Sequence, residues 1–194
     1  MENGANAENK ELYRLFLERL GTTTTLTGKM KPLKALLPLD YAQTERLILH
    51  LGLQMQVLLE EQQGICGFTL DDITVLEGEY YLLTGLQQVV SVSVKNSSVK
   101  NSYNKKEPLF AYTYPMKFSE AAKELLAPEL REKLAAKVLP FTTSLSVGYY
   151  SLAKLCLMCL GLTDNLEALR GSKMYYCLER CLREVPAERA FLYF

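Results

Sequence analysis

Four of the five cysteines stand in two closely spaced pairs that could hold a metal ion. Cys156 and Cys159 form a C-x2-C pair, and Cys177 and Cys181 form a C-x3-C pair, which together resemble the spacing of a four-thiolate zinc site. All four lie within strongly apolar helical patterns, where cysteine serves as a small hydrophobic residue. We therefore expect reduced core thiols, with zinc binding as the alternative. The odd number of cysteines also argues against a secreted disulfide framework.

The other candidates for chemistry are a lone histidine and two adjacent aspartates. His50 falls inside a predicted helix with no nucleophile pattern nearby, so we expect a structural or surface role. Asp71 and Asp72 could hold a cation, but aspartates in a short loop more often cap the turn. The sequence pattern contains no nucleophile with a matching base and orienting group, which disfavours an enzyme built on these residues.

The overall composition excludes several partners. Basic and acidic residues number 22 each, so the formal net charge is zero and no overall field attracts nucleic acid or an anionic membrane. The longest apolar run is interrupted by polar residues, and the N-terminal residues are polar, so we expect neither a membrane span nor a signal peptide. We expect an intracellular protein that takes no cofactor, nucleic acid, membrane or small-molecule substrate.

One stretch must lie at the centre of the fold. Residues 144–160 carry apolar side chains on every face and a single charge, Lys154, so they predict a buried helix around which the rest of the chain packs. Asp40 is a plausible N-cap for a long helix, and Gly21 a plausible C-cap for a short one. These and further helices are predicted over residues 10–20, 41–62, 118–126, 128–138, 166–169 and 174–183.

The β structure is predicted to be small. Residues 73–76 and 80–83 form a hairpin with a turn over residues 77–79, and a third strand is expected over residues 89–94. Residues 95–108 are rich in Lys, Asn and Ser and predict a mobile loop. The predicted fold is mainly α with a small β-hairpin. Residues 1–32 form a polar tail, disordered over residues 1–9, with a short helix, and residues 33–194 form the globular domain.

Several motifs, taken in order, resemble the larger, C-terminal lobe of a protein kinase. Gly64-Ile65 resembles the entry to the catalytic loop, and the A-P-E motif that closes the activation segment has a counterpart in residues 126–130, LAPEL. Residues 149–153, YYSLA, resemble the start of the central buried helix. Residues 177–182, CLERCL, with the following proline and Arg189, resemble the closing signature. The resemblance covers residues 33–194 and implies a helical, kinase C-lobe-like domain.

The resemblance implies one structural ion pair. In the family, the glutamate of A-P-E pairs with the last conserved arginine, and the matching residues here are Glu129 and Arg189. A buried charge without a partner is costly, so both residues should be kept or lost together. Both are present in this chain.

The catalytic motifs depart from the family pattern. One alignment places Cys66, Gly67 and Phe68 at H-R-D and Ile73 at the metal-binding asparagine. A shift by one residue instead places Gly67 at the catalytic aspartate and Asp72 at the asparagine. Neither alignment supplies a base for phosphoryl transfer, although Asp72 could still hold a cation in the second.

The remaining parts of a kinase site are also missing. Thr84 stands at the magnesium-binding aspartate of D-F-G, and residues 1–32 contain neither a glycine-rich loop nor a lysine in a V-A-I-K strand. Without these groups nothing neutralises or clamps the phosphates. We therefore expect neither ATP binding nor kinase activity.

The resemblance is thus to a reduced pseudokinase, in which the large lobe is kept as a packing scaffold. Such chains are similar to kinase-like proteins of large double-stranded DNA viruses, some of them carried in particles. The expected function is a non-catalytic interaction or structural module, within a larger assembly such as a virion. The alternatives are a regulator that docks on an active kinase and an enzyme of another class that reuses the lobe.

Loss of the small lobe predicts an exposed apolar surface, which typically marks a partner site. Either a protein partner or the N-terminal helix, through Tyr13, Phe16 and Leu17, should cover it, and we expect the partner. The residues predicted to form this surface are Phe68, Leu70, Leu82 and Leu86.

Overall fold

A computed structural model describes residues 2–21, 29–85, 89–91, 94–100, 106–112, 118, 120–137, 139–144 and 146–192. Helices predominate in the described part of the chain, in agreement with the predicted mainly α fold, and small antiparallel sheets accompany them. The α-helices are α1 (Glu2–Arg19), α2 (Tyr41–Glu60), α3 (Glu120–Leu125), α4 (Pro128–Ala135), α5 (Ser146–Cys159) and α6 (Lys173–Cys181).

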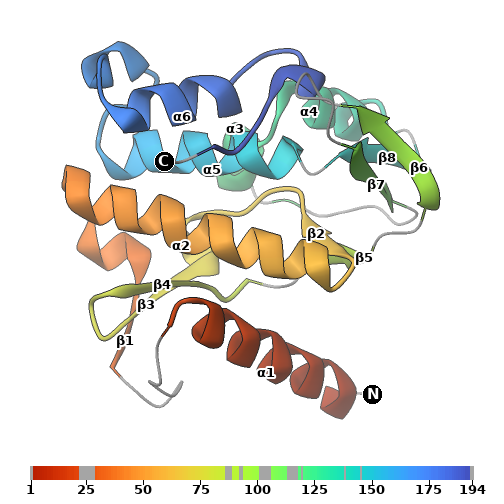
Figure 1. The fold of residues 1–194 in the computed structure, drawn as a ribbon, viewed down its shortest axis with the longest axis horizontal. Helices are drawn as coiled ribbons and strands as arrows, with labels where there is room; N and C mark the ends of the chain where they lie inside the picture. Colours follow the sequence, from red (N-terminus) through yellow and green to blue (C-terminus); the bar gives the residue numbers. More distant parts are fainter. Residues whose placement is uncertain are drawn as a thin grey trace.

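Helix α2 crosses the middle of the molecule, with α5 and α6 on one side and the hairpin and α1 on the other (Figure 1). It begins where predicted, because the Asp40 side chain accepts a hydrogen bond from the Gln43 backbone N–H at 2.7 Å. The Gln43 side chain accepts the Asp40 N–H in return, which completes a capping box. Its buried positions face both layers, so α2 is the helix that joins the two halves of the core.

Helix α5 is the buried helix that its sequence predicts. Most of its residues are inaccessible to solvent, including Leu152, Leu155 and Cys156. Its one charged residue, Lys154, is partly exposed and pairs with Asp164. An all-apolar helix is stable in water only when other elements surround it, and α2, α3 and α6 contact α5 here.

Three small antiparallel sheets occur in the described residues, where the sequence predicted one hairpin. The hairpin is confirmed: β3 (Ile73–Leu76) pairs with β4 (Tyr80–Leu83), and the turn places Glu77 and Gly78 at positive φ. Strand β1 (Met30–Pro32) adds to the edge of β3. The other two sheets pair β2 (Gln63–Ile65) with β5 (Val89–Ser91), and β6 (Val94–Lys100) with β7 (Lys106–Tyr112) and β8 (Phe141–Ser144).

The predicted loop over residues 95–108 is therefore wrong for much of its length. Its two ends lie in β6 and β7, and only residues 101–105 fall outside the described residues. The predicted third strand at residues 89–94 is split between β5 and the first residue of β6. Backbone pairing with β8, which is distant in sequence, stabilises β7 without any local apolar alternation.

Helix α1 is longer than predicted and belongs to the core. Residues 2–9, expected to be disordered, continue the helix, and Gly21 follows its end at a φ of +71°, as a C-cap requires. Leu12, Phe16 and Leu17 are buried in one cluster with residues of α2 and the hairpin. The N-terminal segment is therefore part of the packed body.

The C-terminal residues also pack against α2. The Phe191 ring lies so close to Gly52 of α2 that a Cβ atom at position 52 would approach its Cζ to 2.3 Å. The same ring stacks on Tyr149 of α5, with 5.7 Å between ring centroids. Glycine at position 52 therefore allows a close approach between a helix and an aromatic side chain.

Among the described residues, no helix has the length and apolar character that crossing a membrane requires.

Candidate functional site

Gly67, which the shifted alignment places at a catalytic aspartate, lies in a buried turn that leaves no room for a side chain. A Cβ atom on Gly67 would stand 2.2 Å from Cδ2 of Leu126 and 3.5 Å from the Phe118 ring. Leu126 is fully buried, so it cannot move aside into solvent. Apolar side chains therefore fill the place where this alignment would put a carboxylate.

Asp72 closes the short loop after Phe68 through hydrogen bonds to Thr69. Its carboxylate Oδ2 accepts hydrogen bonds from the Thr69 backbone N–H at 2.7 Å and from the Thr69 hydroxyl at 3.0 Å. In return, the Thr69 hydroxyl accepts the Asp71 N–H and caps the short 3-10 helix Leu70–Asp72. Asp71 itself is exposed and forms an ion pair with Lys34 at 2.5 Å. The predicted capping role is confirmed for Asp72, whereas the side chain of Asp71 pairs with Lys34 instead.

Thr84, which the alignment places at the magnesium-binding aspartate, is held against the same loop. The Asp72 carbonyl accepts the N–H groups of Thr84 at 2.7 Å and Gly85 at 3.0 Å. The Thr84 hydroxyl lies 3.0 Å from the Thr74 hydroxyl. A Cβ atom on Gly85 would collide with the Asp72 side chain at 1.9 Å, so glycine is required there.

Helix α1 reaches this loop through Tyr13, whose hydroxyl donates to the Thr84 carbonyl at 2.9 Å. Burial of the ring raises the pKa of Tyr13, so the hydroxyl keeps its proton and acts as a donor. This contact joins the N-terminal helix to the residue that follows β4. The apolar spacing of residues 10–20 predicted the helix, but it carried no signal for the contact.

Gln54 is a structural residue that sequence reasoning missed. From the middle of α2, its Nε2 donates to the Tyr81 carbonyl at 2.7 Å and its Oε1 accepts the Leu83 N–H at 2.8 Å. Gln54 is fully buried and satisfies backbone groups of β4 that lack a strand partner on that side. A glutamine on the apolar face of a predicted helix was the available signal.

His50, one turn earlier on α2, has a structural role, as predicted. Its Nδ1 accepts the Tyr81 N–H at 3.2 Å, and its ring stacks on Tyr80. Burial, with a smaller contribution from the charge of Arg46, lowers the pKa of His50 to about 4. The ring is therefore neutral near pH 7, as an acceptor of this hydrogen bond must be.

The predicted ion pair between Glu129 and Arg189 is present. Arg189 is completely buried, and its Nη1 and Nη2 lie 2.5 and 3.0 Å from the two carboxylate oxygens of Glu129. Its remaining donors bind the Arg183 carbonyl at 2.6 Å and the Glu184 carbonyl at 3.0 Å. The guanidinium also lies 5.0 Å from the centre of the Tyr150 ring, a cation–π distance. Every side of the buried charge therefore has a partner.

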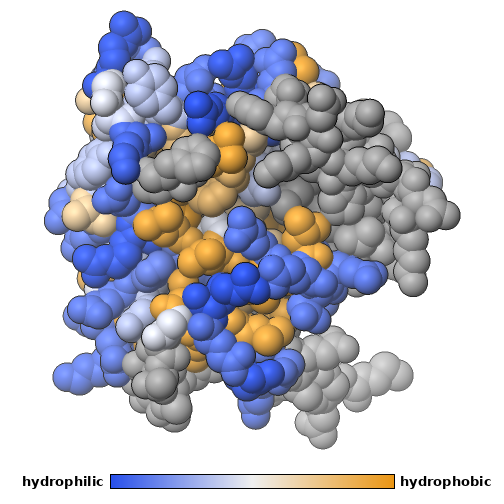
Figure 2. Space-filling view, in the orientation of Figure 1, coloured by the Kyte–Doolittle hydropathy of each residue, from blue (hydrophilic) through white to orange (hydrophobic). Residues whose placement is uncertain are grey.

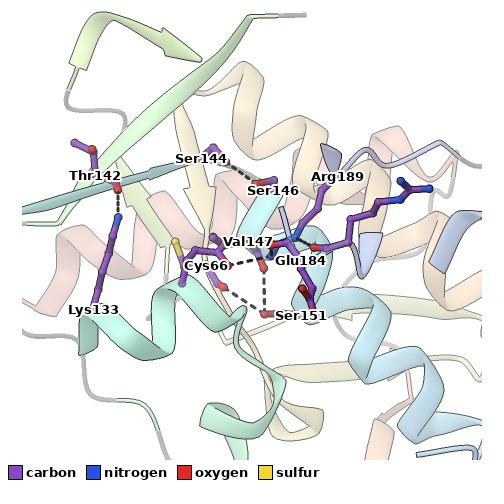
Figure 3. A network of polar contacts seen from close by, with 11 residues as sticks. Cys66, Lys133, Thr142, Ser144, Ser146, Val147, Ser151, Glu184 and Arg189 are labelled. Carbon is purple, nitrogen blue, oxygen red and sulfur yellow. Dashed lines mark hydrogen bonds and ion pairs between the residues drawn. The ribbon is translucent and has the colours of Figure 1, made fainter. Parts of the chain in front are cut away.

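A second polar contact lies close to this pair, as Figure 3 shows. The Ser151 hydroxyl of α5 lies 3.3 Å from the carbonyl of Cys66 and from that of Val147. It joins the central helix to the turn that contains Gly67. The segment from Cys66 to Thr84 is thus contacted by α5 at one end and by α1 at the other.

All five cysteines are free and buried, as expected for core thiols. Burial raises the pKa of Cys159 to about 12 and also raises that of Cys156. The protonated thiol is a poor metal ligand. In the part of the chain that the structure describes, no three His, Cys, Asp or Glu side chains are grouped so that they could hold a metal ion.

The predicted apolar surface is wrong for two of its residues. Phe68 and Leu82 are buried in the same core cluster as Phe16 of α1, and Leu70 is half-buried. Leu86 lies outside the described residues. The physical reason is that α1 places its apolar side chains in the shared core on the hairpin side of the molecule. The N-terminal helix, which was the alternative to a protein partner, therefore contributes to covering these residues.

Apolar surface is found elsewhere. Figure 2 shows apolar atoms over the middle of the face on which α2 lies, surrounded by polar groups. Single exposed apolar residues of this kind are normal on soluble domains and do not by themselves mark an interface. The large apolar residues with the greatest exposure in the described part of the chain are Met30, Tyr41, Leu49, Leu139, Tyr176 and Val185.

Comparison with known families and proteins does not assign this chain to a family. No protein-family model matches it, and no curated protein matches it.

Proposed function

We propose that this chain is a non-catalytic interaction module, a helical scaffold of the pseudokinase kind that binds a protein partner. The observation that carries the proposal is the closed loop at Asp72. Its carboxylate bonds to Thr69, and its carbonyl accepts the backbone of residues 84 and 85. The groups that phosphoryl transfer would need are therefore used inside the protein.

Two further features support the same function. Leu126 fills the space beside Gly67, and Tyr13 of α1 is bonded to Thr84, so both positions are in contact with other parts of the chain. The buried Arg189 pair instead joins the first turn of α4 to the C-terminal segment, which suits a scaffold. The expectation of a viral particle rests on the resemblance alone, and detection of the chain at fixed stoichiometry in a purified particle would test it.

Titration with ATP and Mg²⁺, followed by thermal unfolding, tests the absence of a nucleotide site. A ligand at 100 times its Kd stabilises the folded state by about 2.7 kcal/mol, an easily measured rise in Tm. We expect no such rise for the full chain, and no phosphate transfer to a generic protein substrate. The matched variants are Asp72→Asn, which changes the loop carboxylate, and Asp71→Asn, which changes the neighbouring exposed one.

A saturable rise in Tm that disappears in Asp72→Asn and persists in Asp71→Asn would overturn the proposal in favour of a surviving nucleotide site. A rise that disappears in neither variant would place nucleotide elsewhere on the molecule and would equally contradict the proposed lack of ligand. An unchanged Tm across the titration supports the proposal.

A further inference from the structure

A pocket of about 440 Å³ lies between α3, α4, the C-terminal half of α5 and the loop after it. This volume is within the range of roughly 300–1,000 Å³ typical of binding pockets. Its walls combine two cations, two anions, a hydroxyl and two apolar side chains. The lining residues are Glu124, Leu125, Arg131, Lys154, Met158, Thr163 and Asp164.

Lys154 is the distinctive residue of this pocket, since it is the only charge on a helix that is otherwise apolar. Its side chain is 22% exposed, whereas that of its partner Asp164 is 74% exposed. A largely buried ammonium requires an anionic partner, but a largely exposed carboxylate returns to water at little cost. An incoming carboxylate can therefore take the place of Asp164 beside Lys154.

Arg131 supplies a second cation on the wall formed by α4. It is exposed and its side chain has no hydrogen-bond or ion-pair partner among the described residues, so its guanidinium is available to a ligand. Guanidinium groups bind carboxylates with two parallel hydrogen bonds, which adds geometric selectivity. Lys154 and Arg131 both come from helices, so their backbones are fixed relative to the pocket.

The other lining groups define what must surround the carboxylate. Leu125 and Met158 offer apolar surface, and methionine adapts readily to different side chains. Glu124 repels a second negative charge on its own side of the pocket. The occupant is therefore one acidic group next to an apolar group, and not a polyanion.

We propose that this pocket docks a peptide segment of a protein partner in which an Asp or Glu is flanked by a large apolar residue. The acidic side chain bridges Lys154 and Arg131, and the apolar one rests on Leu125 and Met158. This inference rests on the proposed function of the chain as an interaction module, and it names the chemistry of the partner.

Selection of random octapeptides on the immobilised full chain tests the proposal. The wild type should enrich peptides with an acidic residue next to Leu, Ile, Met or Phe. Arg131→Glu should reverse this preference and enrich Lys or Arg at the same position. The matched control is Lys173→Glu, an equal charge change at an exposed position outside the pocket, which should select the same peptides as the wild type.

The affinity of the best wild-type peptide is then measured by fluorescence polarisation. Binding should weaken at least about tenfold in Arg131→Glu and in Lys154→Met, and stay unchanged in Lys173→Glu. The proposal is overturned if no peptide class is enriched, if acidic peptides bind Arg131→Glu as well as the wild type, or if Lys173→Glu weakens binding equally.

These outcomes are independent of the nucleotide test. A failure of peptide selection with no response to ATP removes the pocket proposal and leaves the non-catalytic function standing. A response to ATP that depends on Asp72 removes the proposed function, whatever the peptides do.

Discussion

Two polar networks of this molecule, one around the buried Arg189 and one around the half-buried Asp72, differ in reach and in charge. At the base of the helical body, Arg189 joins Glu129, 60 residues away, to the Arg183 and Glu184 carbonyls through a charged side chain. Beneath the hairpin, Asp72 joins residues only 3 to 13 positions away, mostly through backbone groups. The first network joins distant elements, and the second closes one loop.

The difference indicates what each network contributes to the fold. A buried guanidinium cannot be left unpaired, so the Arg189 network persists only as a complete set. The Asp72 network uses a potential metal ligand as a turn residue, and neutral groups satisfy it. The Arg189 network therefore behaves as a structural anchor, and the Asp72 network as a closed loop.

The largest expected effect comes from breaking the charged network. Glu129→Ala should lower the free energy of unfolding by roughly 3–5 kcal/mol, because it leaves the Arg189 charge buried without its carboxylate. Arg189→Met should be similarly harmful alone, and the double variant should lose less than the sum of both. Urea denaturation of the four proteins measures the coupling.

An exposed pair provides the matched control for that cycle. Arg183 and Glu179 lie on the surface of the same region, so Arg183→Ala should cost no more than about 1 kcal/mol. Additive losses for the buried pair, or an equal loss for the exposed one, would contradict the anchoring role of Arg189.

A smaller effect is expected at the closed loop. Gly67→Ala should lower the free energy of unfolding by roughly 1–3 kcal/mol, because the added methyl group meets the buried Leu126 side chain. Gly52→Ala is the matched control: the tail residue Phe191 is only partly buried and can move, and alanine favours a helix. Thermal unfolding should show a clear loss for the first variant and little change for the second; equal losses would mean that the turn at Gly67 is not tightly packed.

The smallest effect concerns pH and the contact between α2 and the hairpin. The pKa of His50 is about 4 in the folded protein and about 6.5 when unfolded, so between these values only the unfolded state gains the proton. The contribution of His50 to stability is therefore complete above pH 6.5 and is lost as the pH falls toward 4. Partial exposure of the ring reduces the magnitude by solvent screening.

Comparison with His50→Asn isolates this contribution, because the asparagine oxygen can still accept the Tyr81 N–H but does not titrate. As the pH is lowered from 6.5 to 4.5, the Tm of the wild type should fall relative to that of the variant. A difference that stays constant over this range would mean that His50 does not keep its neutral form in the fold.

Features with a local cause could be predicted from the sequence. Asp40 caps α2, the turn at Glu77 and Gly78 reverses the hairpin, and Pro128 begins α4 at its first turn. Each depends on the conformational preference or hydrogen-bonding capacity of one or two residues. The burial of α5 follows in the same way from its own apolar composition.

Features with a distant cause could not be predicted in this way. Strand β6 contains Lys, Asn and Ser and has no apolar alternation, so only its pairing with β7 makes it a strand. The contact of Tyr13 with Thr84 joins segments 71 residues apart, and neither segment carries a local signal for it. The Glu129 pair is distant too, yet it could be expected, because the kinase-lobe motifs imply both of its members.

The packing of Phe191 on Gly52 also bears on the order in which the protein folds. Helix α2 is synthesised early, but one of its faces stays uncovered until residues near 191 have been made, and Glu129 likewise waits for Arg189. Domains usually fold as units once their chain is complete, and contacts of long sequence separation slow that step. A ribosome-bound chain that ends before residue 189 should therefore expose the side of α2 that the tail covers, and should be more sensitive to proteases than the full chain.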